Sequence, residues 1–305
     1  MERIYGESGN DRTGEHRAGD YKRRRVQDRE MTGAGVGNQE SGIMRFCSLY
    51  SGSSGNSLFI SSGSTKLLVE AGLSAKRIIA ALDSIGENPA EISAILVSHE
   101  HSDHTKGAGI MSRKFNLPIY ASEGTWRAME GMIGIVSECN KVVFSSYTPF
   151  QIGEIVVTPF PIPHDANEPV GYSFCACGKK VTIATDIGHI SMELLSSFED
   201  SDLLLLESNH DLEMLKVGPY PWPLKKRIAG EHGHLSNDAA GEVIAYMAQK
   251  GTKQFLLGHL SKENNFPELA YQTVCNALCE KCLQAGTDVT VDIALRDRVG
   301  RVIEL

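Results

Sequence analysis

The segment His99-Glu100-His101-Ser102-Asp103-His104 follows directly after the apolar run Ile95-Leu96-Val97. Successive side chains of a strand point to opposite faces, so His99 and His101 share one side and can bind the same ion. The turn that follows carries Asp103 and His104 to the far side of that ion, beside a second one. Imidazole suits zinc, and the added carboxylate also accepts manganese or iron. The spacing therefore predicts a site for two divalent metal ions.

Three further candidate ligands follow other apolar runs. His164 comes just past the run Ile155 to Thr158, Asp186 ends the run that starts at Val181, and His259 ends the run that starts at Gln254. Side chains from different strands must converge to hold an ion, so we expect all three at strand ends around the same centre.

Composition indicates an ordinary globular chain. It has 305 residues, 41% of them hydrophobic, and a formal net charge of -8. No apolar run approaches the roughly 18 residues that span a bilayer, and the N-terminus lacks the apolar segment of a secretory signal. Seven cysteines without scaffold spacing indicate reduced thiols in a cytoplasmic protein. Cys275, Cys279 and Cys282 are expected to pack on one helical face.

The first 43 residues differ from the rest of the chain. They are charged, rich in glycine and nearly free of large apolar side chains, and they include Lys22-Arg23-Arg24-Arg25. Such a segment cannot offset its ordering entropy, which predicts a disordered tail, or a start called too early with Met44 as the natural beginning. The basic run could also contact nucleic acid, although acidic residues such as Asp20 and Asp28 surround it.

Residues 44–305 read as one domain of mixed strands and helices. Strands are expected at 46–50, 58–61, 65–69, 92–97, 119–121, 142–144, 154–159, 171–175, 181–185, 203–206 and 254–258, and helices at 74–85, 110–115, 125–132, 192–197, 238–249 and 268–283. Strands in two blocks with helices between them suit two sheets packed face to face under outer helices.

The tripeptide Gly-His-Leu followed by Ser occurs twice, at His234 and at His259. His259 ends a buried strand, whereas His234 precedes a helix that Ser236 or Asn237 can cap. We therefore assign His259 to the metal. His234 becomes a candidate acid–base group, with Glu207 at the end of a leucine run as its orienting partner; alternatively, His234 only packs against the helix.

Two bound cations favour hydrolysis, because they activate water and hold both the attacking and the leaving oxygen of a phosphodiester. A protonated His234 could supply the proton that a departing alkoxide needs. Asp103, His234 and Glu207 are thus the candidate catalytic residues. The same centre would also hydrolyse β-lactams, thioesters or small esters, so the substrate class must be argued from other segments.

Two segments favour a nucleic acid substrate. The loop 51–57, which contains Ser53 and Asn56, could present backbone N–H groups to a phosphate, although a plain hairpin turn explains it almost as well. The segment 219–227 combines prolines, Tyr220 and Trp222 with three cations near His234. Aromatics stack on bases and cations neutralise phosphates, but a helix start with extended basic side chains is the competing interpretation. The candidate substrate contacts are Ser53, Asn56, Asn209, His210, Lys225, Lys226 and Arg227.

The His-x-His-x-Asp-His order, with His164, Asp186 and His259, resembles the signature of the metallo-β-lactamase superfamily. That resemblance implies a four-layer αββα sandwich. It also implies that His99, His101 and His164 hold one metal, that Asp103, His104 and His259 hold the other, and that Asp186 bridges both. The His234 and Glu207 pair resembles the relay of the superfamily's RNA-processing members.

As a set, the loop 51–57, the segments 99–107, 163–166, 185–188 and 207–211, and the two Gly-His-Leu-Ser segments resemble the YycJ/WalJ branch of this superfamily. Members of that branch are described as 5′ to 3′ exonucleases on double-stranded DNA. The resemblance implies a role in DNA repair or replication, with manganese supporting activity and zinc as another occupant. No large cap insertion and no obvious flexible arm separates Asp186 from His259.

Three hypotheses follow. The first is a metal-dependent DNA exonuclease. The second is a small-molecule hydrolase, such as a cyclic phosphodiesterase or a thioesterase. The third is a binding or regulatory protein with a vestigial site, and the presence of all seven candidate ligands argues against it. The sequence does not identify the protein partner that would recruit the enzyme.

Overall fold

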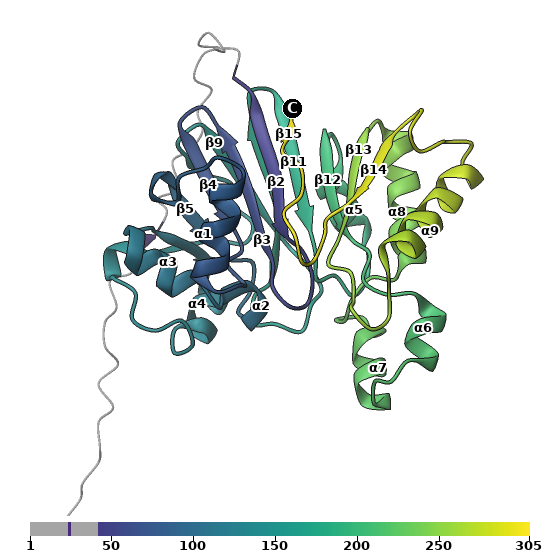
Figure 1. Ribbon diagram of the computed structural model, residues 1–305, viewed down its shortest axis with the longest axis horizontal. Coiled ribbons are helices and arrows are strands. Elements are labelled where there is room, and N and C mark those ends of the chain that lie inside the picture. Colours follow the sequence, from purple (N-terminus) through teal and green to yellow (C-terminus); the bar gives the residue numbers. More distant parts are fainter. Residues whose placement is uncertain (1–23, 26–41) are drawn as a thin grey trace, which may run out of the picture.

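The computed structural model describes residues 24–25 and 42–305, which form two β-sheets with helices on their outer faces (Figure 1). The first sheet has the order β1 (Arg24–Arg25), β7 (Lys141–Phe144), β6 (Ile119–Ser122), β5 (Ala94–Leu96), β4 (Thr65–Val69), β3 (Ser57–Ser62), β2 (Met44–Tyr50) and β15 (Ile303–Glu304). The second has the order β14 (Thr290–Ile293), β13 (Gln254–Gly258), β12 (Leu203–Glu207), β11 (Lys179–Ala184), β10 (Val170–Ala176), β9 (Ile155–Pro161) and β8 (Phe150–Ile152).

The helices divide between the two sheets. The first part of the chain supplies α1 (Ala75–Ser84), α2 (Ser102–Thr105), α3 (Ala108–Phe115) and α4 (Glu123–Met129), together with the 3-10 turns η1 (Pro89–Glu91) and η2 (Glu138–Asn140). The later part supplies α5 (Met192–Phe198), α6 (Leu212–Val217), α7 (Trp222–Ile228), α8 (Asn237–Lys250) and α9 (Pro267–Glu280). In Figure 1, α6 and α7 project from the body, below β12 and β13.

Three apolar layers hold this sandwich together. One lies between the two sheets and combines Phe46 and Leu67 of the first sheet with Phe174 of the second. Another packs the first sheet against α1, α3 and α4, and the third packs the second sheet against α5, α8 and α9. The predicted αββα architecture is therefore confirmed.

Strand β12 shows why a continuous leucine run suits this position. Leu203 and Leu205 belong to the layer between the sheets, whereas Leu204 and Leu206 belong to the layer under the helices. Alternate side chains leave opposite faces of a strand, so a strand covered on both faces needs apolar residues throughout. The run ends at Glu207, which is fully buried, at the edge where the site lies.

Several expectations differ from the structure. The predicted strand 92–97 is shorter, at Ala94–Leu96. The predicted helix 268–283 ends at Glu280, so Cys282 lies beyond it; Cys279 and Cys282 are exposed, and the prediction that these thiols pack on one face is wrong. All seven cysteines are free thiols, as expected.

The sequence also gave no sign of α2, α6, β8, β14 or β15.

The tail predicted over residues 1–43 lies almost wholly outside the described residues. Within it, Arg24 and Arg25 pair in parallel with Val142 and Val143 of β7. Among the helices that the structure describes, none combines the length and the apolar character needed to cross a bilayer.

Candidate metal centre

The candidate ligands converge at one edge of the two sheets. The segment 99–104 follows β5, His164 follows β9, Asp186 follows β11 and His259 follows β13. Strands β11, β12 and β13 are parallel neighbours, so their carboxyl ends meet at the same edge. Residues that are 160 positions apart in the sequence are thereby brought together.

Left-handed backbone turns direct some of these side chains. Asp186 has a φ of 61° and His259 a φ of 55°, and Glu70, at the end of β4, has a φ of 64°. Residues other than glycine seldom adopt this conformation, and such strain concentrates at functional sites. Each of these three residues leaves its strand in this conformation at the edge where the ligands meet.

His99, His101 and His164 form one half of the centre. The Nε2 atom of His99 lies 3.1 Å from Nδ1 of His101, and Nε2 of His164 lies 3.3 Å from the same Nδ1 atom. Ligand atoms placed tetrahedrally around one zinc ion are about 3.3 Å apart, given Zn–N distances of about 2.0 to 2.1 Å. Both distances match this separation, and all three nitrogen atoms lie within 4.8 Å of one another, as a shared ion requires.

Asp103, His104 and His259 form the other half, and their ligand atoms all lie within 4.8 Å of one another. The Oδ2 atom of Asp103 lies 3.7 Å from Nε2 of His104 and 3.6 Å from Nε2 of His259. His104 and His259 are buried, whereas Asp103 is partly exposed. This half is therefore open to solvent on the side of Asp103.

Asp186 lies between the two halves. Its Oδ2 atom is 3.3 Å from Nε2 of His104, and its Oδ1 atom is 3.8 Å from Nε2 of His164. Asp186 Oδ2 and His259 Nε2 are both buried without a hydrogen-bond partner among the described residues. Unpaired buried polar atoms are costly, and divalent cations would satisfy both. The donor set therefore fits divalent metal ions.

The second nitrogen of each buried imidazole contacts an oxygen atom. Nδ1 of His99 is 2.9 Å from Ser98 Oγ, Nδ1 of His104 is 3.1 Å from Glu70 Oε2, and Nδ1 of His164 is 3.1 Å from the backbone oxygen of Gly233. Such contacts fix the tautomer and orientation of histidines that bind metals. Sequence reasoning missed Glu70 and Ser98; the signal for Glu70 was an acidic residue at the end of the apolar run 65–69.

Glu207 organises a network beside these ligands. Its Oε2 atom accepts hydrogen bonds from the backbone nitrogens of Ile187 and Leu235, at 2.9 and 3.0 Å. Its Oε1 atom lies 2.9 Å from Nδ1 of His234 and 2.6 Å from Nδ1 of His259. Burial alone would raise the pKa of Glu207, but the two histidines lower this pKa to about 2. Glu207 is therefore an anion that holds both rings.

The charges of the centre are set by its carboxylates. Burial alone would lower the pKa of His259, but Asp186, Asp103 and Glu207 raise this pKa to about 10. The pKa of His234 is also raised, because Glu207 and Asp186 outweigh its burial. The pKa of His99 is instead held well below its usual range by burial and by the charge on His104. Several carboxylates thus attract positive charge to one small volume.

The loop 51–57 holds the turn that carries Asp103. The backbone nitrogen of Asn56 donates to the Asp103 oxygen at 2.8 Å, and Nδ2 of Asn56 lies 3.1 Å from Nε2 of His104. A Cβ atom at Gly72 would lie 1.5 Å from the same Asp103 oxygen, so only glycine permits this approach. Asn56 is buried, whereas Ser53 is exposed at the tip of the loop.

The basic candidates lie on α7. Lys225 Nζ donates to the backbone oxygen of Lys216 at 2.7 Å, and Arg227 forms an ion pair with Asp165, the neighbour of His164. Lys226 and Trp222 are exposed, Trp222 at 74%. The α6–α7 arm, which we define as residues 211–230, therefore carries an aromatic surface and cations beside the metal centre.

Asn209 and His210 are buried rather than open to solvent. Nδ2 of Asn209 donates to the backbone oxygen of His259 at 2.9 Å. Burial lowers the pKa of His210 to about 4, which keeps this ring neutral. Both residues support the segments that carry His234 and His259.

Comparison with known proteins gives consistent results. The family model of the "Beta-lactamase superfamily domain" matches residues 65–260. The chain is 41% identical over 249 residues to "Exodeoxyribonuclease WalJ" of Streptococcus pneumoniae, covering 81% of this chain and 93% of that protein. It is 42% identical over 243 residues to "Exodeoxyribonuclease YycJ" of Bacillus anthracis, covering 80% and 92% respectively.

Solved structures agree on the fold. The metallo-beta-lactamase fold protein YhfI from Bacillus subtilis has a TM-score of 0.65 at 16% identity, covering 86% of this chain and 100% of that one. Zn(2+)-bound PqqB from Methylobacterium extorquens has a TM-score of 0.64 at 17% identity, with the same coverage. At these identities the likeness concerns the fold alone.

Proposed function

Since this chain belongs to the beta-lactamase superfamily, in the group of the WalJ and YycJ exodeoxyribonucleases, we propose that it is a metal-dependent exonuclease that hydrolyses double-stranded DNA. The observation that carries this proposal is the match to two exodeoxyribonucleases over 93% and 92% of their lengths. The cluster of histidines and carboxylates supplies the matching chemistry.

We assign two divalent ions, zinc or manganese with iron as a third option, to the two halves of the centre. His99, His101 and His164 would hold one ion, Asp103, His104 and His259 the other, and Asp186 would contact both. Bound there, such ions activate water for attack and neutralise charge on the phosphodiester. Asp186 Oδ2 and His259 Nε2, which are buried and have no hydrogen-bond partner among the described residues, support this assignment.

His234 is the proposed proton donor to the leaving oxygen. Glu207 contacts its Nδ1 atom at 2.9 Å, so the Nε2 atom is left to face the substrate. Glu207 and Asp186 raise the pKa of His234, which favours the protonated ring, and its side chain remains 18% exposed. A positioned general acid lowers the barrier for a poor leaving group such as a deoxyribose alkoxide.

The α6–α7 arm is the proposed contact for the DNA strand near the centre. Trp222 offers an exposed ring for base stacking, and Lys226 is an exposed cation beside it. The net charge of the chain is -8, so binding to a polyanion requires positive charge to be concentrated locally. The proposed single domain over residues 44–305 thus carries both the hydrolytic metal centre and the DNA-binding surface.

The test uses purified protein with manganese and duplex DNA that carries a label at either the 5′ or the 3′ end. Progressive loss of one end label without internal nicks is expected, together with slow or no turnover of a chromogenic phosphodiester. Asp186→Ala protein from the same purification is the control for contaminating nucleases and should be inactive. No DNA degradation with any divalent metal would contradict the proposal, and rapid turnover of the small ester alone would favour a small-molecule hydrolase.

A further inference from the structure

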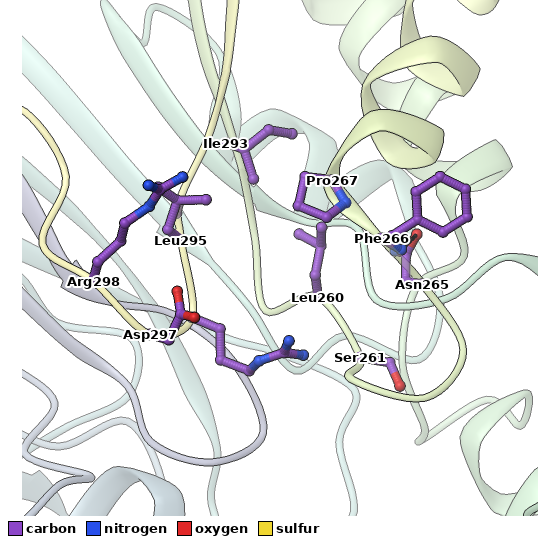
Figure 2. A pocket seen from close by; sticks show the side chains of 11 residues that line it. Leu260, Ser261, Asn265, Phe266, Pro267, Ile293, Leu295, Asp297 and Arg298 are labelled. Carbon is purple, nitrogen blue, oxygen red and sulfur yellow. Dashed lines mark hydrogen bonds between the residues drawn. The ribbon is translucent and has the colours of Figure 1, made fainter.

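A cavity of about 350 Å³ lies between the start of α9 and the segment 293–298. Figure 2 shows Asp297 and Arg298 on one side of it, and Leu260, Phe266 and Pro267 on the other. Arg296 and Ser261 also line it. Nothing in the metal centre described above uses these residues.

The cavity lies next to the metal centre. Leu260 and Ser261 in its wall directly follow His259 in the chain. The aliphatic part of Arg296 packs on Gly52, where an added Cβ atom would lie 2.9 Å from its Cγ atom. The nitrogen of Gly52 in turn donates to Oδ1 of Asn56 at 2.8 Å, and Asn56 contacts His104. A few residues of the loop 51–57 therefore lie between the cavity and the proposed metal ligands.

The cavity carries uncompensated positive charge. Neither Arg296 nor Arg298 forms an ion pair with any of the described residues, whereas the nearby Arg301 pairs with Asp292 at 2.6 Å. Asp297 is the single acidic residue in the lining, against these two arginines. Guanidinium groups without a carboxylate partner favour a phosphate, which they bind through paired hydrogen bonds.

Other polar groups of the lining also suit an anion. The Ser261 hydroxyl accepts from the backbone nitrogen of Asn264 at 3.3 Å and from Asn264 Nδ2 at 3.5 Å, and no residue in the described part of the chain accepts its own proton. Phe266 and Pro267, at the start of helix α9, also line the cavity. The positive end of the helix dipole adds to the attraction for negative charge.

We propose that this cavity binds the terminal phosphate of a DNA strand, with Arg296 as its main contact. The inference rests on the proposed function and explains why cleavage starts at an end. A terminal phosphate carries up to two negative charges near neutral pH, since its second pKa is about 6, whereas an internal phosphodiester carries one. A cavity of about 350 Å³ is large enough for one nucleotide-sized group.

The experiment compares duplexes that end in a 5′-phosphate, a 3′-phosphate or hydroxyl groups only. For the wild-type protein, kcat/KM should be about tenfold or more higher for one phosphorylated end than for the hydroxyl end, as expected for charge-assisted hydrogen bonds. In Arg296→Gln this ratio should fall to about one, Arg296→Lys should recover part of it, and Arg301→Gln should retain it. Melting temperatures should show that all variants fold.

A binding measurement separates this inference from the proposed function. Metal-free protein is titrated with a short fluorescent DNA strand that carries or lacks the preferred terminal phosphate. Wild-type and Arg301→Gln protein should bind the phosphorylated strand more tightly, and Arg296→Gln should bind both equally. If the wild-type enzyme is active but Arg296→Gln keeps its preference for the phosphorylated end, this inference alone is overturned. The same holds if Arg296→Gln loses kcat/KM equally on all three duplexes. Absence of any DNA degradation would instead overturn the proposed function.

Discussion

Glu207 Oε1 lies 2.6 Å from Nδ1 of His259. The same oxygen atom lies 2.9 Å from Nδ1 of His234. One carboxylate therefore orients a proposed metal ligand and the proposed proton donor together. The two ring centroids lie 5.3 Å apart, so the proposed metal binding and the proposed proton transfer both depend on a single buried anion.

Replacing Glu207 by glutamine tests this shared dependence. A neutral amide has one oxygen, which cannot accept from two imidazoles and two backbone N–H groups at once. We expect Glu207→Gln to weaken metal binding and to lower turnover, each by about 10- to 100-fold. Metal affinity by competition with a chelating dye and kcat on duplex DNA are the measurements. Glu193→Gln, at an exposed position on α5, should leave both unchanged; normal metal affinity in Glu207→Gln would refute the link to His259.

The two Gly-His-Leu histidines should respond differently to alanine. His234→Ala should keep the metal content of the wild type and lower turnover by about 10²- to 10⁴-fold, because only a proton donor is lost. His259→Ala should lose metal from its half of the centre. Elemental analysis and single-turnover kinetics on the same preparations distinguish these outcomes. Undiminished turnover in His234→Ala would show that this ring only packs against α8.

Gly72 should tolerate no side chain. An added Cβ atom would lie 1.5 Å from the Asp103 oxygen, so Gly72→Ala must displace the turn that carries Asp103 and His104. We expect a loss of about 1 to 3 kcal/mol in the free energy of unfolding, typical of overpacking, and reduced metal content. Gly131→Ala is the control, since no atom lies within 4 Å of its added Cβ. Chemical denaturation gives the comparison, and equal stability of both variants would contradict this packing.

The cysteines should divide by reactivity. Cys47 is fully buried in β2, and burial raises its pKa to about 11. Cys139, Cys177, Cys279 and Cys282 are exposed. Because the thiolate is the reactive species, a thiol reagent at pH 8 should label the four exposed residues in native protein and reach Cys47 only after unfolding. Mass spectrometry of labelled peptides gives the result, and rapid native labelling of Cys47 would contradict its place in the core.

Much of the fold could be predicted from local patterns. The short apolar run 203–206 favours a strand that is covered on both faces, and the structure places it so. The periodicity around Cys275 to Cys282 was less informative, because it continued past Glu280, where α9 ends. The short helices α6 and α7 were harder to predict. They have only 6 and 7 residues, which is less than two helical turns, and each is bounded by a glycine or a proline.

The seven proposed metal ligands could be found from the sequence because each follows an apolar run that ends at the edge of a sheet. Their supporting residues could not be found in this way. Glu70 contacts His104 across 34 positions of sequence, and Glu207 reaches His259 across 52. These contacts depend on how the strands are ordered in the sheets. The proposed role of Arg296 and Arg298 likewise could not be predicted from the sequence, because it depends on their position beside Ser261 and the start of α9 in the structure.

The central claim is that far-apart strand ends meet around a pair of divalent ions, and metal stoichiometry tests it most directly. Purified protein is loaded with zinc or manganese, desalted and measured by inductively coupled plasma mass spectrometry, alongside Asp186→Ala. We expect two ions per wild-type chain and at most one in Asp186→Ala, because the Asp186 carboxylate contacts both halves of the centre. A wild-type chain that retains no more than trace metal under every loading condition would contradict it.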